Sequence, residues 1–243
     1  MESAVGVEAR SSRALLGVFA PGPEHWVGDG FFVKTVFWPQ IGAEMLSPFL
    51  LLDHAARRGF EASPWRRGVG EHPHRGFETL TMLFEGRMDH VDSLGNEVPL
   101  VSGSTQNMVA GSGIQHGGDM GADPETGRFH DVQLWVNMPA VAKMTAPTIA
   151  NMHRADTPVI EGGHYRLEVL AGSLAGAVSV LSTTQPTAIG RLQTSAVGDI
   201  SIEGIDPGWN VLVYVLEGAI DIDGHHVEQF ETAVLAADGD VVE

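Results

Sequence analysis

The feature that most restricts how this chain can fold is the segment Val69–Asp119, in which His72, His74 and His116 stand among short apolar runs. Turn-forming residues interrupt these runs at close intervals, at Gly86, Gly95 and Gly103. Short apolar stretches separated by glycine are typical of β-strands joined by tight connections. The segment therefore predicts a β-sheet structure that carries three imidazoles.

The spacing of the first two histidines predicts that they share one face of a strand. Successive side chains of a strand point to opposite faces, so residues i and i+2 lie on the same side. If a single strand covers about 72–84, His72, His74 and Glu78 line one face together. Pro73 cannot donate a backbone hydrogen bond, which places this part of the strand at a sheet edge or a bulge.

Neutral imidazole is the commonest protein ligand for divalent transition metals, and a pair at i and i+2 with a third histidine in a nearby glycine-rich turn has the composition of a metal site. His72, His74 and His116 are the predicted ligands. The adjacent pair His225 and His226 would point to opposite faces of a strand, so we assign it to loop surface.

Composition excludes several classes of protein. With 14 basic against 31 acidic residues, the net charge of −17 disfavours direct binding of nucleic acid. The chain has no cysteine, which excludes disulfides and thiolate metal sites. We expect no transmembrane helix, because no apolar run reaches about 18 residues. The N-terminus makes a poor signal peptide, so a cytoplasmic location is expected.

Several motifs resemble those of the pirin family, within the cupin superfamily: PFLLLDH, HPHRGFETLT, HVDSLGN, MVAGSGIQH and DVQLWVN. The resemblance covers most of the chain and implies an all-β fold of two tandem cupin (jelly-roll type) β-barrels. It also implies a mononuclear iron, or another divalent transition metal, in the N-terminal barrel. The implied ligands are His72, His74, His116 and a glutamate two residues after the last histidine.

That glutamate is missing, because Gly118 occupies its position. Three replacements remain open: Glu78, from a position that cupins commonly use; Asp119, turned inward by a bulge; or water at an open coordination position. Glu78 is the candidate fourth ligand or catalytic proton acceptor, and beside a water-filled site it would orient a histidine. If the carboxylate vacancy is real, Gly118→Glu should tighten metal binding.

The second half repeats the first in outline. Thr81–Asp92 aligns with Val213–Gly224 as strand, Glu-Gly, strand and acidic turn, which indicates a duplicated unit. The positions equivalent to the paired histidines are Gly204 and Asp206, so we expect no metal there. The predicted organisation is an N-terminal barrel with the metal site over 1–137, a crossover linker over 138–165 and a C-terminal barrel over 166–243.

Fold alone does not decide function, since cupins host many chemistries. The resemblance implies a flavonol (quercetin) 2,3-dioxygenase activity for some relatives, with a small polyphenol-like substrate at the metal. Two other hypotheses stay open at this stage. One is a non-catalytic, redox-sensitive metal protein that regulates a protein partner. The other is a degenerate site, weakly occupied by metal because of Gly118.

Overall fold

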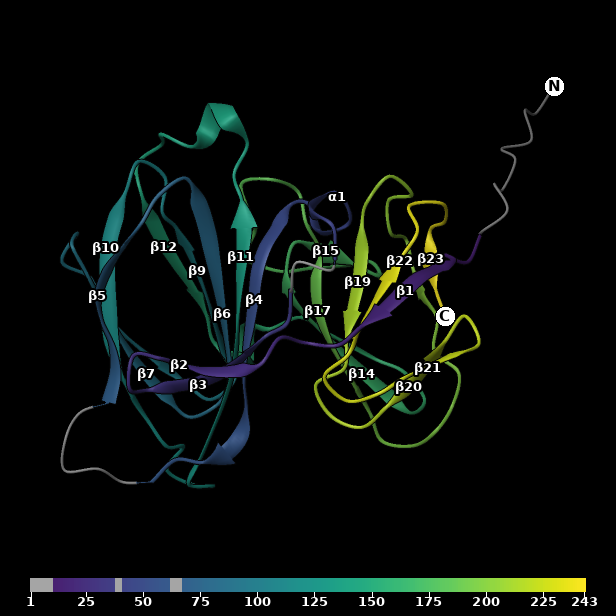
Figure 1. Ribbon diagram of the computed structural model, residues 1–243, viewed down its shortest axis with the longest axis horizontal. Helices are drawn as coiled ribbons and strands as arrows, with labels where there is room; N and C mark the ends of the chain where they lie inside the picture. The colour runs from purple at the N-terminus through teal and green to yellow at the C-terminus, as the bar shows by residue number, and fades with distance from the viewer. Residues whose placement is uncertain (1–10, 38–40, 62–66) are drawn as a thin grey trace.

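The computed structural model describes residues 11–37, 41–61 and 67–243 (Figure 1). Almost all of its regular structure is β-strand. Within the described ranges, the helical segments are three single turns: α1 (Ala43–Leu46), η1 (Ala140–Ala142) and η2 (Arg154–Asp156). No helix there is long and apolar enough to cross a membrane. The predicted all-β class is confirmed.

The N-terminal half contains two antiparallel sheets that face each other (Figure 1). The larger has the strand order β12-β9-β6-β11-β4-β3-β2 and the smaller β5-β10-β7-β8. Their bounds are β2 (Glu24–Val27), β3 (Phe31–Thr35), β4 (Phe49–Gly59), β5 (Arg67–His74), β6 (Phe77–Glu85), β7 (Arg87–Asp92), β8 (Glu97–Val101), β9 (Ser104–Val109), β10 (Ile114–Gly121), β11 (Arg128–Asn137) and β12 (Thr148–Met152).

Side-chain alternation gives the large sheet two buried faces. The inner face packs Leu83 and Phe129 against Leu100 of the small sheet. The outer face packs Leu80 and Val132, with their strand neighbours, against the C-terminal half. A sheet covered on both sides needs apolar residues at both strand parities, as β6 and β11 show. The large sheet therefore separates the small sheet, which carries the predicted histidine ligands, from the C-terminal half.

The C-terminal half is made of shorter strands arranged in small sheets. They are β13 (Val159–Glu161), β14 (Tyr165–Ala171), β15 (Ser173–Leu174), β16 (Ala177–Val178), β17 (Ile189–Thr194), β18 (Ile202–Glu203), β19 (Val211–Tyr214), β20 (Ile220–Ile222), β21 (His225–Val227), β22 (Thr232–Leu235) and β23 (Val241–Val242). The predicted Glu-Gly repeat is visible in both halves: Gly86 and Gly218 each adopt positive φ, of 124° and 80°, between consecutive strands.

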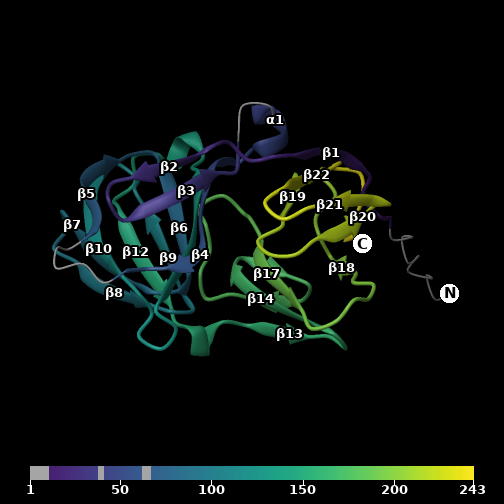
Figure 2. The same cartoon turned by 60° about the horizontal axis from the view of Figure 1, so that its bottom comes forward.

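The structure departs from the expected boundaries at two places. First, β1 (Leu15–Phe19) pairs with β22, so this part of the predicted 1–137 unit belongs to the C-terminal half. Figure 2 shows the purple β1 beside β22, whereas β2 and β3 lie over the N-terminal half. Second, the predicted linker 138–165 contains paired strands: β12 extends the large sheet and β13 pairs with β14. Its prolines separate these strands without preventing them.

A buried polar chain crosses between the halves. His54 Nδ1 lies 2.8 Å from the Tyr214 hydroxyl, and His54 Nε2 lies 3.0 Å from His130 Nε2. Burial lowers the pKa of His54 to about 3 and that of His130 to about 4, so both imidazoles are neutral at pH 7. The chain joins β4 and β11 of the large sheet to β19 of the C-terminal half.

Candidate metal centre

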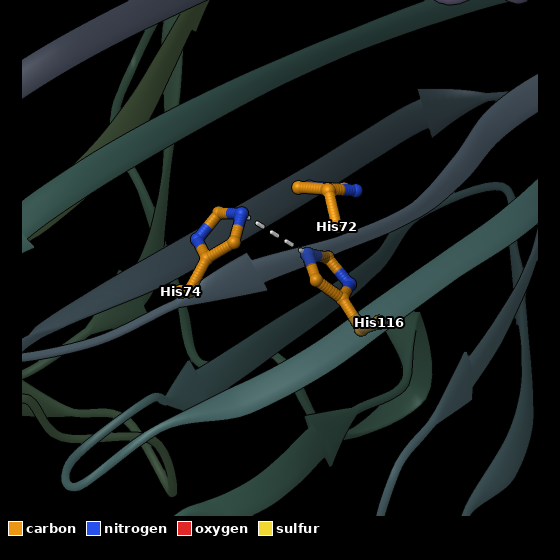
Figure 3. Close-up of side chains that lie close together, drawn as sticks. All are labelled: His72, His74 and His116. Atoms are coloured by element: carbon orange, nitrogen blue, oxygen red, sulfur yellow. Dashed lines mark hydrogen bonds between the residues drawn. The ribbon is translucent and has the colours of Figure 1, made fainter.

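The three predicted histidines meet on the small sheet of the N-terminal half. His72 and His74 lie on β5, which is an edge strand, as Pro73 predicts. His116 lies on the neighbouring β10, directly opposite His72 in the antiparallel register. The i, i+2 spacing puts both β5 imidazoles on the same side, and the register brings the third to them (Figure 3).

The geometry is that of converging ligands. The ligand atoms of the three residues all lie within 4.8 Å of one another. His74 Nε2 and His116 Nε2 are 3.3 Å apart (Figure 3). Two neutral imidazole nitrogens that face each other can share at most one proton. A metal cation between them would instead accept a lone pair from each nitrogen. Among the described residues, this is the one group of His, Asp or Glu side chains with metal-site geometry.

Burial keeps the imidazoles of His74 and His116 in the form that binds metal. Burial, and then the neighbouring imidazoles, lower the pKa of His116 to about 3. Burial and His72 lower that of His74 to about 4. Both side chains are therefore neutral at pH 7, and imidazole binds metals in its neutral form. His72 Nδ1 lies 2.9 Å from the Gly70 carbonyl oxygen, which leaves Nε2 for a metal.

Aromatic side chains form one wall of the centre. The Trp135 ring on β11 lies 5.2 Å from the His74 ring and stacks on Phe77 at 4.4 Å. The indole Nε1 donates to Gln133 Oε1 at 3.1 Å, which fixes the ring's orientation. A rigid apolar wall limits access of water to the imidazoles and leaves a flat surface for an aromatic ligand.

The predicted position of Glu78 is wrong. The chain does not continue as one strand over 72–84, because it turns at Gly76, whose φ is +75°. Glu78 consequently lies on β6, in the large sheet, and is fully buried. Its Oε1 accepts the Thr184 backbone N–H at 2.6 Å and its Oε2 accepts Asn107 Nδ2 at 3.1 Å. This carboxylate links the two halves, so the sequence argument that placed it beside His72 and His74 fails.

Gly118 also behaves differently from the sequence expectation. A bulge separates His116 from Gly118 in the β10–β5 register. A Cβ added at Gly118 would lie 1.9 Å from the Asp89 carbonyl oxygen. No side chain fits without moving β7, so the vacancy is not simply a missing carboxylate. Asp119 pairs with Asp89 on β7 and with Gly68 on β5 in the register.

Sequence reasoning missed His90 and Asp92 on β7. In the register, Gly118 lies opposite His90 and His116 opposite Asp92. The His90 and His116 rings are 5.3 Å apart, and Asp92 Oδ2 holds His90 Nε2 at 3.0 Å. Asn96 and backbone amides hold Asp92 in turn, and these hydrogen bonds lower its pKa against the effect of burial. The i, i+2 spacing in HVD is the signal that could have identified this pair.

One cavity joins the centre to the space between the sheets. Its volume is about 80 Å³, which is room for several waters. The small sheet contributes His72, His90 and His116 to its lining, and the large sheet contributes Gln106, Gln133 and Asp131. A ligand in the cavity would therefore contact the imidazoles and the polar inner face of the large sheet together.

Comparison with known proteins identifies the family to which this chain is similar. The Pirin family model matches residues 32–136. A Pseudomonas aeruginosa protein provisionally named a quercetin 2,3-dioxygenase is 34% identical over 237 residues, covering 93% of this chain and 80% of its own. A pirin-like protein of Caulobacter vibrioides is 34% identical over 210 residues, covering 82% and 71%.

Solved structures show the same fold. The crystal structure of quercetin 2,3-dioxygenase from Acinetobacter baumannii superposes with a TM-score of 0.79 at 33% identity, over 96% of this chain and 82% of that one. Escherichia coli pirin YhhW in complex with nickel(II) superposes with a TM-score of 0.60 at 19% identity, over 93% and 95%. The family-model match and the identity to the pirin-like protein of Caulobacter vibrioides show that the chain belongs to the pirin family of cupin proteins.

Proposed function

We propose that this protein is a metal-dependent dioxygenase that acts on a flavonol of the quercetin type. The observation that carries the proposal is the convergence of three imidazoles beside a cavity between the sheets, with the Trp135 ring packed against His74. The similarity to proteins named quercetin 2,3-dioxygenase, at 33–34% identity, supports the substrate class. Iron, manganese, nickel and copper are all compatible with an imidazole donor set.

The residues fit a divalent transition metal. His72, His74 and His116 would hold it, and coordination positions would stay open for substrate. The metal would supply Lewis-acid polarisation of the bound flavonol oxygens and redox chemistry toward dioxygen, in a reaction that opens the ring and releases carbon monoxide.

The chain's own groups position and shield the substrate. Trp135 and Phe77 present a flat surface against which an aromatic ring can stack. His90 lines the cavity beside His116, and its imidazole, which Asp92 holds through Nε2, can hold a substrate hydroxyl through Nδ1. Apolar residues between the sheets, such as Val33 and Leu100, restrict water.

The test combines metal analysis with turnover. Protein purified without chelators is analysed for bound metals, then stripped and reloaded separately with iron, manganese, nickel or copper. We expect one metal per chain and consumption of quercetin with oxygen uptake in at least one sample. A fully loaded protein that consumes no quercetin with any of the four metals contradicts the proposal. Loss of metal binding throughout would support the degenerate site considered from the sequence.

A further inference from the structure

The inner face of the large sheet carries an acid pair, Asp53 and Asp131, that the proposed metal chemistry does not use. Both line the cavity that reaches the histidines. Asp131 is 2% exposed, and its Oδ1 has no hydrogen-bond partner among the described residues. A buried polar atom without a partner costs on the order of 1–3 kcal/mol, so its retention calls for a function.

The neighbours of the acid pair form a polar row across the sheet. Gln106, Thr81, Gln133 and Asp53 lie opposite one another on β9, β6, β11 and β4. Thr35 Oγ1 donates to Asp53 Oδ1 at 2.8 Å, and Gln133 Nε2 to Thr81 Oγ1 at 3.4 Å. These hydrogen bonds hold the row in place, whereas Oδ1 of the neighbouring Asp131 has no hydrogen-bond partner among the described residues.

The backbone also changes at Asp131. The pairing of β11 shifts between Phe129 and Asp131 against β4, and between His130 and Asp131 against β6. Bulges re-aim side chains and are frequent beside active sites. Along β11, Trp135 adjoins His74 while Asp131 lies four residues away, a separation of roughly 13 Å in an extended strand. One aromatic ligand is therefore long enough to reach from the histidines to the acid pair, and the cavity of about 80 Å³ would have to widen to admit it.

We propose that Asp131, assisted by Asp53, forms a second subsite of the cavity that receives a hydroxyl group of the substrate at a distance from the metal. This rests on the proposed function and narrows its substrate class to polyhydroxylated aromatic molecules with hydroxyls remote from the metal-binding oxygens. A phenolic hydroxyl both donates and accepts, so it can form a hydrogen bond with the unpartnered Oδ1 of Asp131 whether that carboxyl is charged or protonated.

Charge favours a hydroxyl over a cation at this subsite. Burial, and then the Asp53 carboxylate, raise the pKa of Asp131 well above its usual range. Burial also raises the pKa of Asp53, with the Thr35 hydrogen bond opposing it. A protonated Asp131 leaves the pair with at most a single negative charge. A cationic ligand there would also share the cavity with a divalent metal, which repels it.

The test compares two flavonols on zinc-loaded protein, so that binding is measured without turnover. Quercetin carries hydroxyls remote from its chelating oxygens, whereas 3-hydroxyflavone keeps only the chelating pair. We expect wild type to bind quercetin at least tenfold more tightly, because a site built to hydrogen-bond a hydroxyl discriminates against an analogue that lacks it. Asp131→Ala should reduce the ratio to about twofold, and Asp131→Asn should preserve most of it. The exposed Asp199→Ala is the matched control.

Resorcinol on the same zinc-loaded proteins separates this inference from the proposed function. Resorcinol binding that Asp131→Ala weakens tenfold, together with no quercetin turnover, would support the subsite and reject the flavonol reaction. Quercetin turnover with an unchanged quercetin preference in Asp131→Ala would keep the reaction and overturn the subsite. Thermal melts establish that each variant is folded, and Asp131→Leu, which removes both oxygens at nearly the same size, provides the ratio if Asp131→Ala is not. Tighter binding of methylammonium than of resorcinol would also overturn the proposal.

Discussion

The two halves of this chain share an outline but differ in what fills their interiors. The N-terminal half builds sheets from long strands, such as the 11 residues of β4 and the 10 of β11. It encloses imidazoles, carboxyls and amides. The C-terminal half has no strand longer than the seven residues of β14 in the described chain, and its own core is apolar: Val215, Ile222, Val227, Ala233 and Leu235. The long strands of the N-terminal half pair with neighbours on both sides. This pairing allows that half to bury polar side chains, which pack less favourably than apolar ones.

The local structure also explains why the C-terminal repeat lacks a counterpart of the histidine pair. The positions equivalent to the histidine pair, Gly204 and Asp206, lie in a loop, where Gly204 has a φ of +77°. Asp206 caps its own turn by accepting the Gly208 backbone N–H at 2.8 Å. At the positions equivalent to His72 and His74, the C-terminal half therefore has a loop where the N-terminal half has an edge strand.

The largest expected effect concerns the histidines of the two halves. His74→Ala should weaken zinc binding by roughly 100-fold or more, since changes to groups that merely support a ligand cost 10–100-fold. The control His226→Ala removes an exposed histidine of the C-terminal half and should leave affinity unchanged. Competition with a chromophoric chelator measures both. Equal losses in the two variants would mean that the site is not where the three imidazoles converge.

Gly118→Glu tests the tightness of the N-terminal sheet. Because the added Cβ would meet the Asp89 carbonyl oxygen, we expect the unfolding free energy to fall by about 3 kcal/mol and metal affinity not to improve. Gly121→Ala is the control on the same strand, since a Cβ there meets nothing within 4 Å. Urea unfolding measures the stability of both variants, and metal titration measures their affinity. Tighter metal binding by Gly118→Glu would mean that Gly118 simply lacks a ligand carboxylate, as inferred from the sequence.

Glu78→Gln tests the link between the halves. The amide keeps one acceptor for Thr184 but opposes the Asn107 amide with a second donor, so we expect a loss of about 2 kcal/mol in urea unfolding. Zinc affinity should stay within twofold. A tenfold fall in affinity without loss of stability would return Glu78 to the metal site.

The last prediction is a pH dependence of stability that has opposite sign in the two halves. The folded pKa values of His54 and His130, about 3 and about 4, lie below the unfolded value near 6.5. The unfolded state therefore binds more protons, and stability present above pH 6.5 is lost as pH falls, by up to about 1.4 kcal/mol per pH unit for each histidine. Urea unfolding of metal-free protein between pH 5 and 7.5 measures the slope, to which His74 and His116, with folded pKa values of about 4 and about 3, also contribute.

In the C-terminal half, hydrogen bonding to Asp221 raises the pKa of the exposed His226. Its contribution is present at low pH and disappears as pH rises through the folded pKa. His226→Asn should therefore leave the acid-side slope of the whole protein unchanged. A stability that is flat from pH 5 to 7.5 would contradict the neutral, buried state of His54 and His130.

The sequence by itself determined the all-β class, the edge position of Pro73 and the shared face of His72 and His74. These follow from local rules: the period of two in a strand and the missing donor of proline. The third ligand, His116, was identified by its glycine-rich motif, and the antiparallel register then placed it opposite His72.

Only the tertiary structure decided the rest. The turn at Gly76 moved Glu78 into another sheet, and pairing across more than 200 residues moved β1 into the C-terminal half. The acid pair arose from the register of β11 against β4. Periodicity says which residues share a face of one strand, but long-range pairing decides which strands face each other, and that choice places a buried carboxylate either at a metal or at a link between domains.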